Sequence, residues 1–197
     1  HVEAGLRSFD RTMPEEINRL VPATLADYCF TTCEDANANL RREGVPQENI
    51  FFVGNVMIDT LLRHLELAKR SPILDALGVE PGRYALVTLH RPANVDEPAA
   101  AGEMVEAFRY LDRRLPVVFP IHPRTRSRFE AFGLGPTLAG LGRLRLTEPL
   151  GYLDFLQLMA NARVVLTDSG GIQEETTVLG VPCLTLRENT ERPVTIT

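Results

Sequence analysis

The sequence predicts an α/β protein in which helices cover parallel β-sheets. Short apolar runs rich in β-branched and aromatic residues recur along all 197 residues, and segments with helical periodicity separate them. This alternation is typical of parallel sheets, because two parallel neighbours need a long crossover connection that is usually a helix.

The expected elements follow one another closely along the chain. The predicted strands are Tyr28–Thr31, Ile50–Val53, Tyr84–Leu89, Val117–Pro120, Arg143–Leu146, Arg163–Thr167 and Cys183–Leu186. The predicted helices are Glu15–Ala26, Asp35–Arg42, Met57–Lys69, Glu97–Arg113, Tyr152–Ala160 and Ile172–Leu179. Glycines just beyond an apolar helical face, Gly44, Gly78 and Gly180, indicate where three of the helical segments stop.

A domain boundary is expected where charged residues, Ser71-Pro72 and Pro81-Gly82 precede a strongly apolar strand. We therefore predict one domain at 1–69, a linker at 70–82 and a second domain at 83–197. The first region holds two convincing strands, too few for an independent doubly wound sheet, so we expect that domain to be incomplete in this chain.

Composition narrows the function classes. The chain is 44% hydrophobic and 24% charged, as in an ordinary globular protein, and its net charge of -5 provides no general basic surface for nucleic acid or for an anionic membrane. No apolar run approaches the roughly 20 residues that a membrane span needs. The three cysteines lack the close Cys/His pairs of a zinc site, which favours reduced thiols in a cytoplasmic protein. Because the chain begins at His1 without a charged and apolar leader, we expect its true start to lie upstream.

A strand–turn–helix segment runs from Arg163 to Glu175. Gly170 and Gly171 would let a phosphate approach the backbone at a helix N-terminus, and Ser169 adds a hydroxyl donor. Glu175, one turn into the helix, could accept hydrogen bonds from the two hydroxyls of a ribose. The alternative is that Asp168 or Ser169 only caps the helix and that the glycines only serve the turn.

Two carboxylates and two histidines stand at expected element ends. Glu3 follows what looks like the end of a strand, and Glu15 stands in the first turn of a helix that Pro14 begins, so both are candidates for a cleft rim. They can equally be a solvated loop charge and a helix-dipole acid. His90 and His122 each follow a strand, where either a functional or a structural role is open.

Six motifs in order resemble the non-hydrolysing UDP-N-acetylglucosamine (UDP-GlcNAc) 2-epimerases, and the resemblance covers essentially the whole chain. They are HVEAGLR at 1–7, PEEINR at 14–19, VGNVMID at 53–59, HRPAN at 90–94, DSGGIQEE at 168–175 and TERP at 190–193. The resemblance implies a GT-B-like fold, in which two Rossmann-like doubly wound domains face a cleft, and a homodimer. It also implies that a basic phosphate-binding segment and a further catalytic aspartate lie before His1.

The resemblance assigns roles to residues that match these motifs. Glu3, Glu15 and His90 match catalytic positions. The substrate-binding positions are Arg19, Leu150, Phe155, Ser169, Gly170, Gly171, Glu175 and Arg192. Arg91 and His122 are candidates for an effector site or for supporting contacts behind the substrate. Pro92, Ala93 and Arg124 depart from the family pattern, which argues against an effector site in this area.

The implied reaction interconverts UDP-GlcNAc and UDP-N-acetylmannosamine (UDP-ManNAc) and requires no metal or redox cofactor. Departure of UDP from C1 would acidify the C2–H bond, and a carboxylate would remove that proton. Three rivals stay open. They are a GT-B glycosyltransferase, which would explain Glu175 but not the carboxylates Glu3 and Glu15, a hydrolysing epimerase, and a module that binds UDP-sugars without turnover.

Overall fold

The computed structural model describes residues 1–187, 190–192 and 195, and it divides into two compact units. Unit 1 comprises His1–Thr60 together with the described residues after Arg187, and unit 2 comprises Leu61–Arg187. This division differs from the linker predicted at 70–82. Leu61 and Ala68 of helix α3 (Val56–Ala68) are fully buried in a core of unit 2, and helix α4 (Ile73–Leu77) packs against the same core, so that segment is part of the unit.

Unit 1 has a small parallel sheet. Strand β1 (Cys29–Thr31) pairs with strand β2 (Ile50–Phe52), and on its other side Phe30 forms a parallel bridge with Val2. The bridge places Val2 beside β1 and agrees with the extended segment expected before Glu3. Around this sheet lie α1 (Pro14–Leu25), α2 (Glu34–Arg42) and the 3₁₀ turn η1 (Gln47–Asn49).

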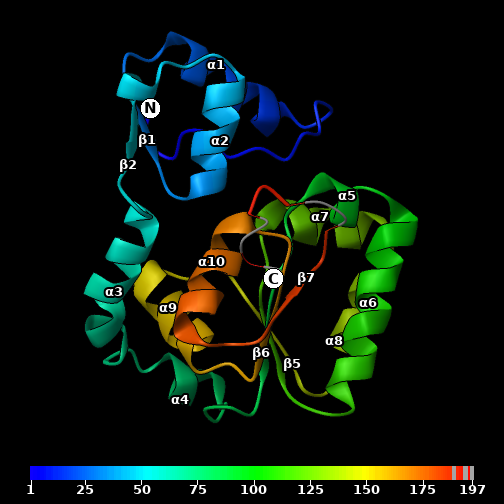
Figure 1. The fold of residues 1–197 in the computed structure, drawn as a ribbon. Helices are drawn as coiled ribbons and strands as arrows, with labels where there is room; N and C mark the ends of the chain where they lie inside the picture. Colours follow the sequence, from blue (N-terminus) through cyan, green and yellow to red (C-terminus); the bar gives the residue numbers. More distant parts are fainter. Residues whose placement is uncertain (188–189, 193–194, 196–197) are drawn as a thin grey trace. The chain divides into compact units, whose positions relative to one another are not determined.

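Unit 2 contains a five-stranded sheet in which every pairing is parallel (Figure 1). The strand order is β5-β4-β3-β6-β7. The strands are β3 (Ala85–Thr88), β4 (Val117–Pro120), β5 (Leu144–Thr147), β6 (Val164–Thr167) and β7 (Cys183–Thr185). From β3 the chain first adds strands on one side and then crosses over to add β6 and β7 on the other, so the topological switch point lies between β3 and β6.

Helices cover both faces of this sheet. Alternate side chains of a strand point to opposite faces, so Ala85 and Val87 of β3 join one core while Leu86 joins the other. The first face packs against α5 (Pro92–Val95), α6 (Pro98–Asp112), α7 (Pro123–Ala131) and α8 (Gly135–Ala139). The second packs against α3, α4, α9 (Tyr152–Ala160) and α10 (Gly170–Leu179), and Figure 1 shows these two layers on either side of the strands.

The predicted α/β class and the parallel sheets are therefore confirmed, and each predicted strand and helix is found within a few residues of its expected bounds. Helices α4, α5, α7 and α8 were not predicted. Three of them are only four or five residues long, and α4 lies in the segment that was predicted to be a linker. Within the described residues, no helix is long and apolar enough to cross a membrane.

Candidate functional site

The carboxyl ends of β3 and β6 are joined by hydrogen bonds at the switch point of unit 2. The hydroxyls of Thr88 and Thr167 lie 2.7 Å apart, and the amide of Ser169 donates to Thr167 Oγ1 at 3.0 Å. The loops that follow the two strands therefore start side by side. In open α/β sheets, ligands bind at this crevice outside the strand ends.

The fully buried carboxylate of Asp168, directly after β6, connects this strand end to the segment that follows β3. It accepts hydrogen bonds from the amides of His90, at 3.0 Å, and Arg91, at 2.8 Å, and from Asn94 Nδ2 at 3.1 Å. The His90 ring adds a contact of 3.0 Å between Nδ1 and Asp168 Oδ1. Burial alone would raise the pKa of Asp168, but these hydrogen bonds and the His90 charge hold that pKa below its ordinary value.

Asp168 is thus a central residue, although from the sequence it was considered only in the alternative that Asp168 or Ser169 caps the helix, and the structure does not support that alternative. Ser169 occupies the N-cap position of α10 without a side-chain capping bond, while Asp168 ties down the loop after β3. The signal in the sequence was its place at the end of a buried strand, because a carboxylate there either meets donors from the neighbouring loop or stays unpaired.

Helix α10 begins directly at the switch point. Ser169, Gly170 and Gly171 form its first turn, as predicted, so free backbone N–H groups and the positive end of the helix dipole lie there. Glu175 is buried on the same helix at 8% exposure. Burial and the neighbouring Glu174 raise the pKa of Glu175 to about 6.

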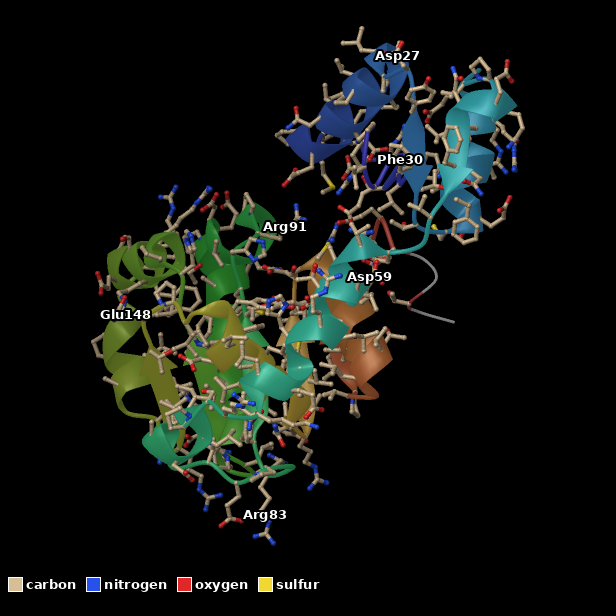
Figure 2. The ribbon with its side chains drawn as sticks, turned by 90° about the vertical axis from the view of Figure 1, so that its left-hand side faces the viewer. Asp27, Phe30, Asp59, Arg83, Arg91 and Glu148 are labelled. Carbon is tan, nitrogen blue, oxygen red and sulfur yellow. The ribbon has the colours of Figure 1, made fainter. Side chains whose placement is uncertain are left out.

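The other predicted residues of unit 2 lie on loops at strand ends or on α9. Leu150 and Phe155, before and within α9, are partly buried against the core that α10 also contacts. Arg91 is the N-cap residue of α5, and Figure 2 shows it at the end of unit 2 opposite Arg83. His122 caps α7, where its Nδ1 accepts the amide of Arg124 at 3.2 Å, so it has a structural role.

A second group of predicted residues gathers in unit 1. Glu3 adopts a left-handed backbone with φ of 57°, and its carboxylate accepts a hydrogen bond from Arg192 at 3.2 Å. A non-glycine residue in that region is strained by roughly 1–3 kcal/mol. Arg192 was expected in the second domain, but its contact with Glu3 places it in unit 1.

The start of α1 places two adjacent glutamates in different environments. Glu15 is exposed, whereas Glu16 is buried at 2% exposure and accepts the amides of Ser8 and Phe9 at 3.0 and 3.1 Å. Burial would raise the pKa of Glu16, but the bonds from Ser8, Phe9 and Arg19 lower it. Glu16 therefore anchors the loop before α1, a role that was not predicted from the sequence. The sequence signal for this role is a glutamate at the third helical position, from which the side chain can reach back to preceding backbone amides.

Arg19 joins this group through two carboxylates. Its guanidinium lies 3.4 Å from Glu16 and 3.2 Å from Glu191. Glu191 is buried and directly precedes Arg192 in the chain, so α1 and the TERP segment are linked within unit 1. Glu191 was not predicted as a site residue from the sequence.

No group of three or more histidine, cysteine or acidic side chains suited to a metal ion occurs among the residues that the structure describes. Unit 2 instead offers anion-binding amides and a histidine, and unit 1 offers an arginine and carboxylates in separate environments. These are the components for binding a phosphorylated ligand and for moving protons.

The fold and the site define a GT-B-like α/β protein whose candidate site lies at a doubly wound switch point. The family model described as UDP-N-acetylglucosamine 2-epimerase matches residues 1–197, and the chain belongs to this family. The resemblance to UDP-N-acetylglucosamine 2-epimerases that the six motifs indicated is thereby confirmed.

Individual relatives support the same assignment. The UDP-N-acetylglucosamine 2-epimerase of Methanocaldococcus jannaschii is 46% identical over all of this chain and 55% of that protein. Its crystal structure in complex with UDP-GlcNAc and UDP matches with a TM-score of 0.92 at 45% identity, again over 100% of this chain and 55% of that one. The UDP-2,3-diacetamido-2,3-dideoxy-D-glucuronate 2-epimerase of Pseudomonas aeruginosa is 41% identical over 97% of this chain and 52% of that protein. The chain thus spans about half the length of these relatives.

Proposed function

We propose that the protein is a non-hydrolysing 2-epimerase that interconverts UDP-GlcNAc and UDP-ManNAc. The observation that supports this most strongly is the switch point of unit 2. There the first turn of α10 begins next to His90, and Glu175 lies buried on the same helix. A helix N-terminus suits a diphosphate, and a carboxylate suits the two hydroxyls of a ribose.

The chemistry must overcome the low acidity of the C2–H bond, which has no adjacent carbonyl. In the proposed reaction the C1–O bond breaks and its electron pair leaves with UDP, so positive charge builds at C1. A carboxylate then takes the C2 proton, and the C–H electron pair forms the C1–C2 double bond of a glycal. Re-addition of UDP at C1 and protonation of C2 on the other face give the epimer.

This route needs carboxylates near C1 and C2 and donors for the departing UDP. We assign the acid/base and cation-stabilising roles to Glu3 and Glu15, and the contacts with the leaving diphosphate to His90 and Arg192. The strained backbone and partial exposure of Glu3, at 31% for its side chain, are typical of a residue held in place for function. Arg192 already lies beside an anion in Glu3, so a phosphate is a natural competitor for it.

The nucleotide would be bound by residues around α10. We assign the diphosphate to Ser169, Gly170 and Gly171, and the ribose to Glu175. The uracil would lie near Phe155 and the backbone of Leu150. Arg19 would support the carboxylates of unit 1, since it already pairs with two of them.

The setting of the reaction belongs to the same proposal. We infer a cytoplasmic homodimer that supplies ManNAc units for cell-surface polysaccharide, without a nucleic-acid or membrane partner. The net charge of -5 supports the last point, because it offers no general attraction to either polyanion.

The test is proton NMR of UDP-GlcNAc incubated with the full-length protein in D2O. Reversible elimination predicts deuterium at C2 in a mixture of UDP-GlcNAc and UDP-ManNAc. Free ManNAc would instead identify the hydrolysing enzyme. An unchanged and undeuterated sugar would rule out the epimerase, and tight UDP binding without turnover would then identify a binding module. Transfer of the sugar to an acceptor would identify the glycosyltransferase.

Matched variants test the residue roles. Glu3→Gln and Glu15→Gln are each expected to slow C2 deuteration by about 10²- to 10⁴-fold, the contribution of a positioned acid or base. Glu48→Gln, on an exposed turn of unit 1, is the control and should leave the rate unchanged. Because a relative acts on a 2,3-diacetamido glucuronate, that UDP-sugar belongs in the same substrate panel.

A further inference from the structure

The fully buried carboxylate Asp168 has no role in the reaction as proposed so far. It is not on the surface of the crevice, since its exposure is 0%, and it therefore acts through other groups. Within the part of the chain that the structure describes, its hydrogen bonds all go to the segment that follows β3, namely to two backbone amides, to Asn94 and to the ring of His90.

Burying a carboxylate is strongly unfavourable unless hydrogen bonds and opposite charge compensate for the lost hydration. The amides of His90 and Arg91 and the amide group of Asn94 donate neutral hydrogen bonds. Of these donors, only the His90 ring can also carry a positive charge. The lowered pKa of Asp168 agrees with this arrangement, because it keeps the carboxylate ionised at neutral pH.

An ionised carboxylate only accepts hydrogen bonds, so the ring nitrogen that faces it must carry a hydrogen. That nitrogen is Nδ1, at 3.0 Å from Asp168 Oδ1. The tautomer protonated only at Nε2 would place a lone pair of Nδ1 against the negative charge. The contact thus selects the ring forms with a hydrogen on Nδ1, since the bond made by one ring nitrogen determines the state of the other.

The other ring nitrogen remains available to a ligand. The His90 side chain is 46% exposed, although its partner is fully buried. Because β3 and β6 are neighbours at the switch point, the ring stands at the edge where α10 begins. In the protonated ring both nitrogens donate, Nδ1–H to Asp168 and Nε2–H to an oxygen of a bound anion.

We propose that Asp168 is a positioning residue that keeps Nδ1 of His90 protonated and presents Nε2 to the diphosphate of the nucleotide sugar. The identity of the ligand rests on the proposed function, whereas the state of the ring rests on the geometry alone. Asn94 strengthens the same set of hydrogen bonds, because its side chain also donates to the Leu186 carbonyl at 2.9 Å and so fixes the loop that carries His90.

The first test is the protonation state of His90, observed as the two ring ¹⁵N shifts of histidine-labelled protein by long-range ¹H–¹⁵N correlation. The chain has four histidines, so a His90→Asn variant assigns the signal. A proton on Nδ1 near neutral pH, alone or with one on Nε2, is the expected result. A neutral ring protonated at Nε2 in the wild-type protein would overturn the proposal without any need for a variant at Asp168.

The second test compares Asp168→Asn with Asn94→Ala. The first keeps the size of the side chain and an acceptor for the loop amides but removes the charge, so His90 should shift toward the Nε2-protonated tautomer. C2 deuteration should fall by up to about 10⁴-fold, the loss expected when an active-site histidine has the wrong tautomer. Asn94→Ala removes one hydrogen bond to Asp168 without changing the ring, so the ring ¹⁵N shifts of His90 in this variant should match those of the wild type.

The two proposals fail in different ways. If the wild-type protein shows no C2 exchange, the proposed function fails while the ¹⁵N shifts still report on Asp168. If exchange occurs but Asp168→Asn leaves both the His90 shifts and the rate unchanged, the positioning role is refuted and the proposed function stands. Equal changes of the His90 shifts in the two variants would show that Asp168 only holds the loop, which also refutes the role.

Discussion

Replacement of Glu175 by glutamine should make the protein more stable at neutral pH. The carboxylate is 8% exposed, and burial together with Glu174 raises its pKa from 4.5 to about 6. A shift of about 1.5 units corresponds to roughly 2 kcal/mol, at about 1.4 kcal/mol per unit. The folded protein incurs this cost whenever Glu175 is ionised, and a neutral glutamine avoids it.

The sign of the pH dependence follows from the raised pKa. Protonated Glu175 stabilises the folded state fully below the unfolded pKa of 4.5, and this stabilisation is lost as pH rises through about 6. The advantage of Glu175→Gln should therefore be small near pH 4.5 and reach about 2 kcal/mol above pH 7. The same variant should bind UDP more weakly, because glutamine replaces one acceptor oxygen by a donor.

Urea unfolding followed by far-ultraviolet circular dichroism at pH 5.0 and 7.5 measures this difference. Glu130→Gln is the matched control, since Glu130 is exposed on α7, and it should change stability by less than about 0.5 kcal/mol. If Glu175→Gln were no more stable than the wild type at pH 7.5, or equally stabilised at both pH values, the reasoning from burial would be refuted.

Three further changes test other contacts by urea unfolding. Glu16→Gln should lower the free energy of unfolding of unit 1 by roughly 1.5–3 kcal/mol, the value of hydrogen bonds to a buried charge. Glu15→Gln, on the exposed side of the helix, should lower it by less than about 0.5 kcal/mol. Equal effects of the two variants would contradict the anchoring role of Glu16. Gly5→Ala should lower the free energy of unfolding by at least about 2 kcal/mol, because Gly5 has a φ of 84° and the added Cβ would lie 2.4 Å from a backbone oxygen of α2. Gly44→Ala is the control, since Gly44 has a φ of 88° but nothing within 4 Å of the added Cβ, and it should cost only about 1 kcal/mol. A milder Gly5 variant would show that the loop shifts away from α2. Tyr84→Phe should cost about 1 kcal/mol through the lost bond from its hydroxyl to a carbonyl of α9, and an unchanged midpoint would show that this buried bond contributes nothing net.

The sequence predicts the strands well because their signal is local. A buried parallel strand such as Val164–Thr167 needs continuous apolar residues, and few other elements do. The helix Pro123–Ala131 escaped prediction because arginines and serine dominate it and only Thr125 and Phe129 are buried, so its apolar face is too narrow to show a period.

The site was predictable only in part. Motif residues such as Glu3 and Ser169 could be found because they follow strand ends, and the structure brings Glu3 and Arg192 together within unit 1. Asp168 and Glu16 carry a local signal, but the partners that define their roles could not be predicted, because the donors lie far along the chain or in a preceding loop. Periodicity reports which face a residue occupies, but not which partner meets it there.

The strand order of unit 2 also determines when the crevice can form. β3 is the first strand of the sheet along the chain, yet it becomes central only when β6 pairs beside it, and the hydroxyl contact that joins their ends spans 79 positions. A chain synthesised as far as β5 can pair β3, β4 and β5, but the edge of β3 that later pairs with β6 stays without hydrogen-bond partners and exposes apolar residues. Pairing of β6 with β3 therefore both covers an aggregation-prone edge and brings Asp168 to the switch point.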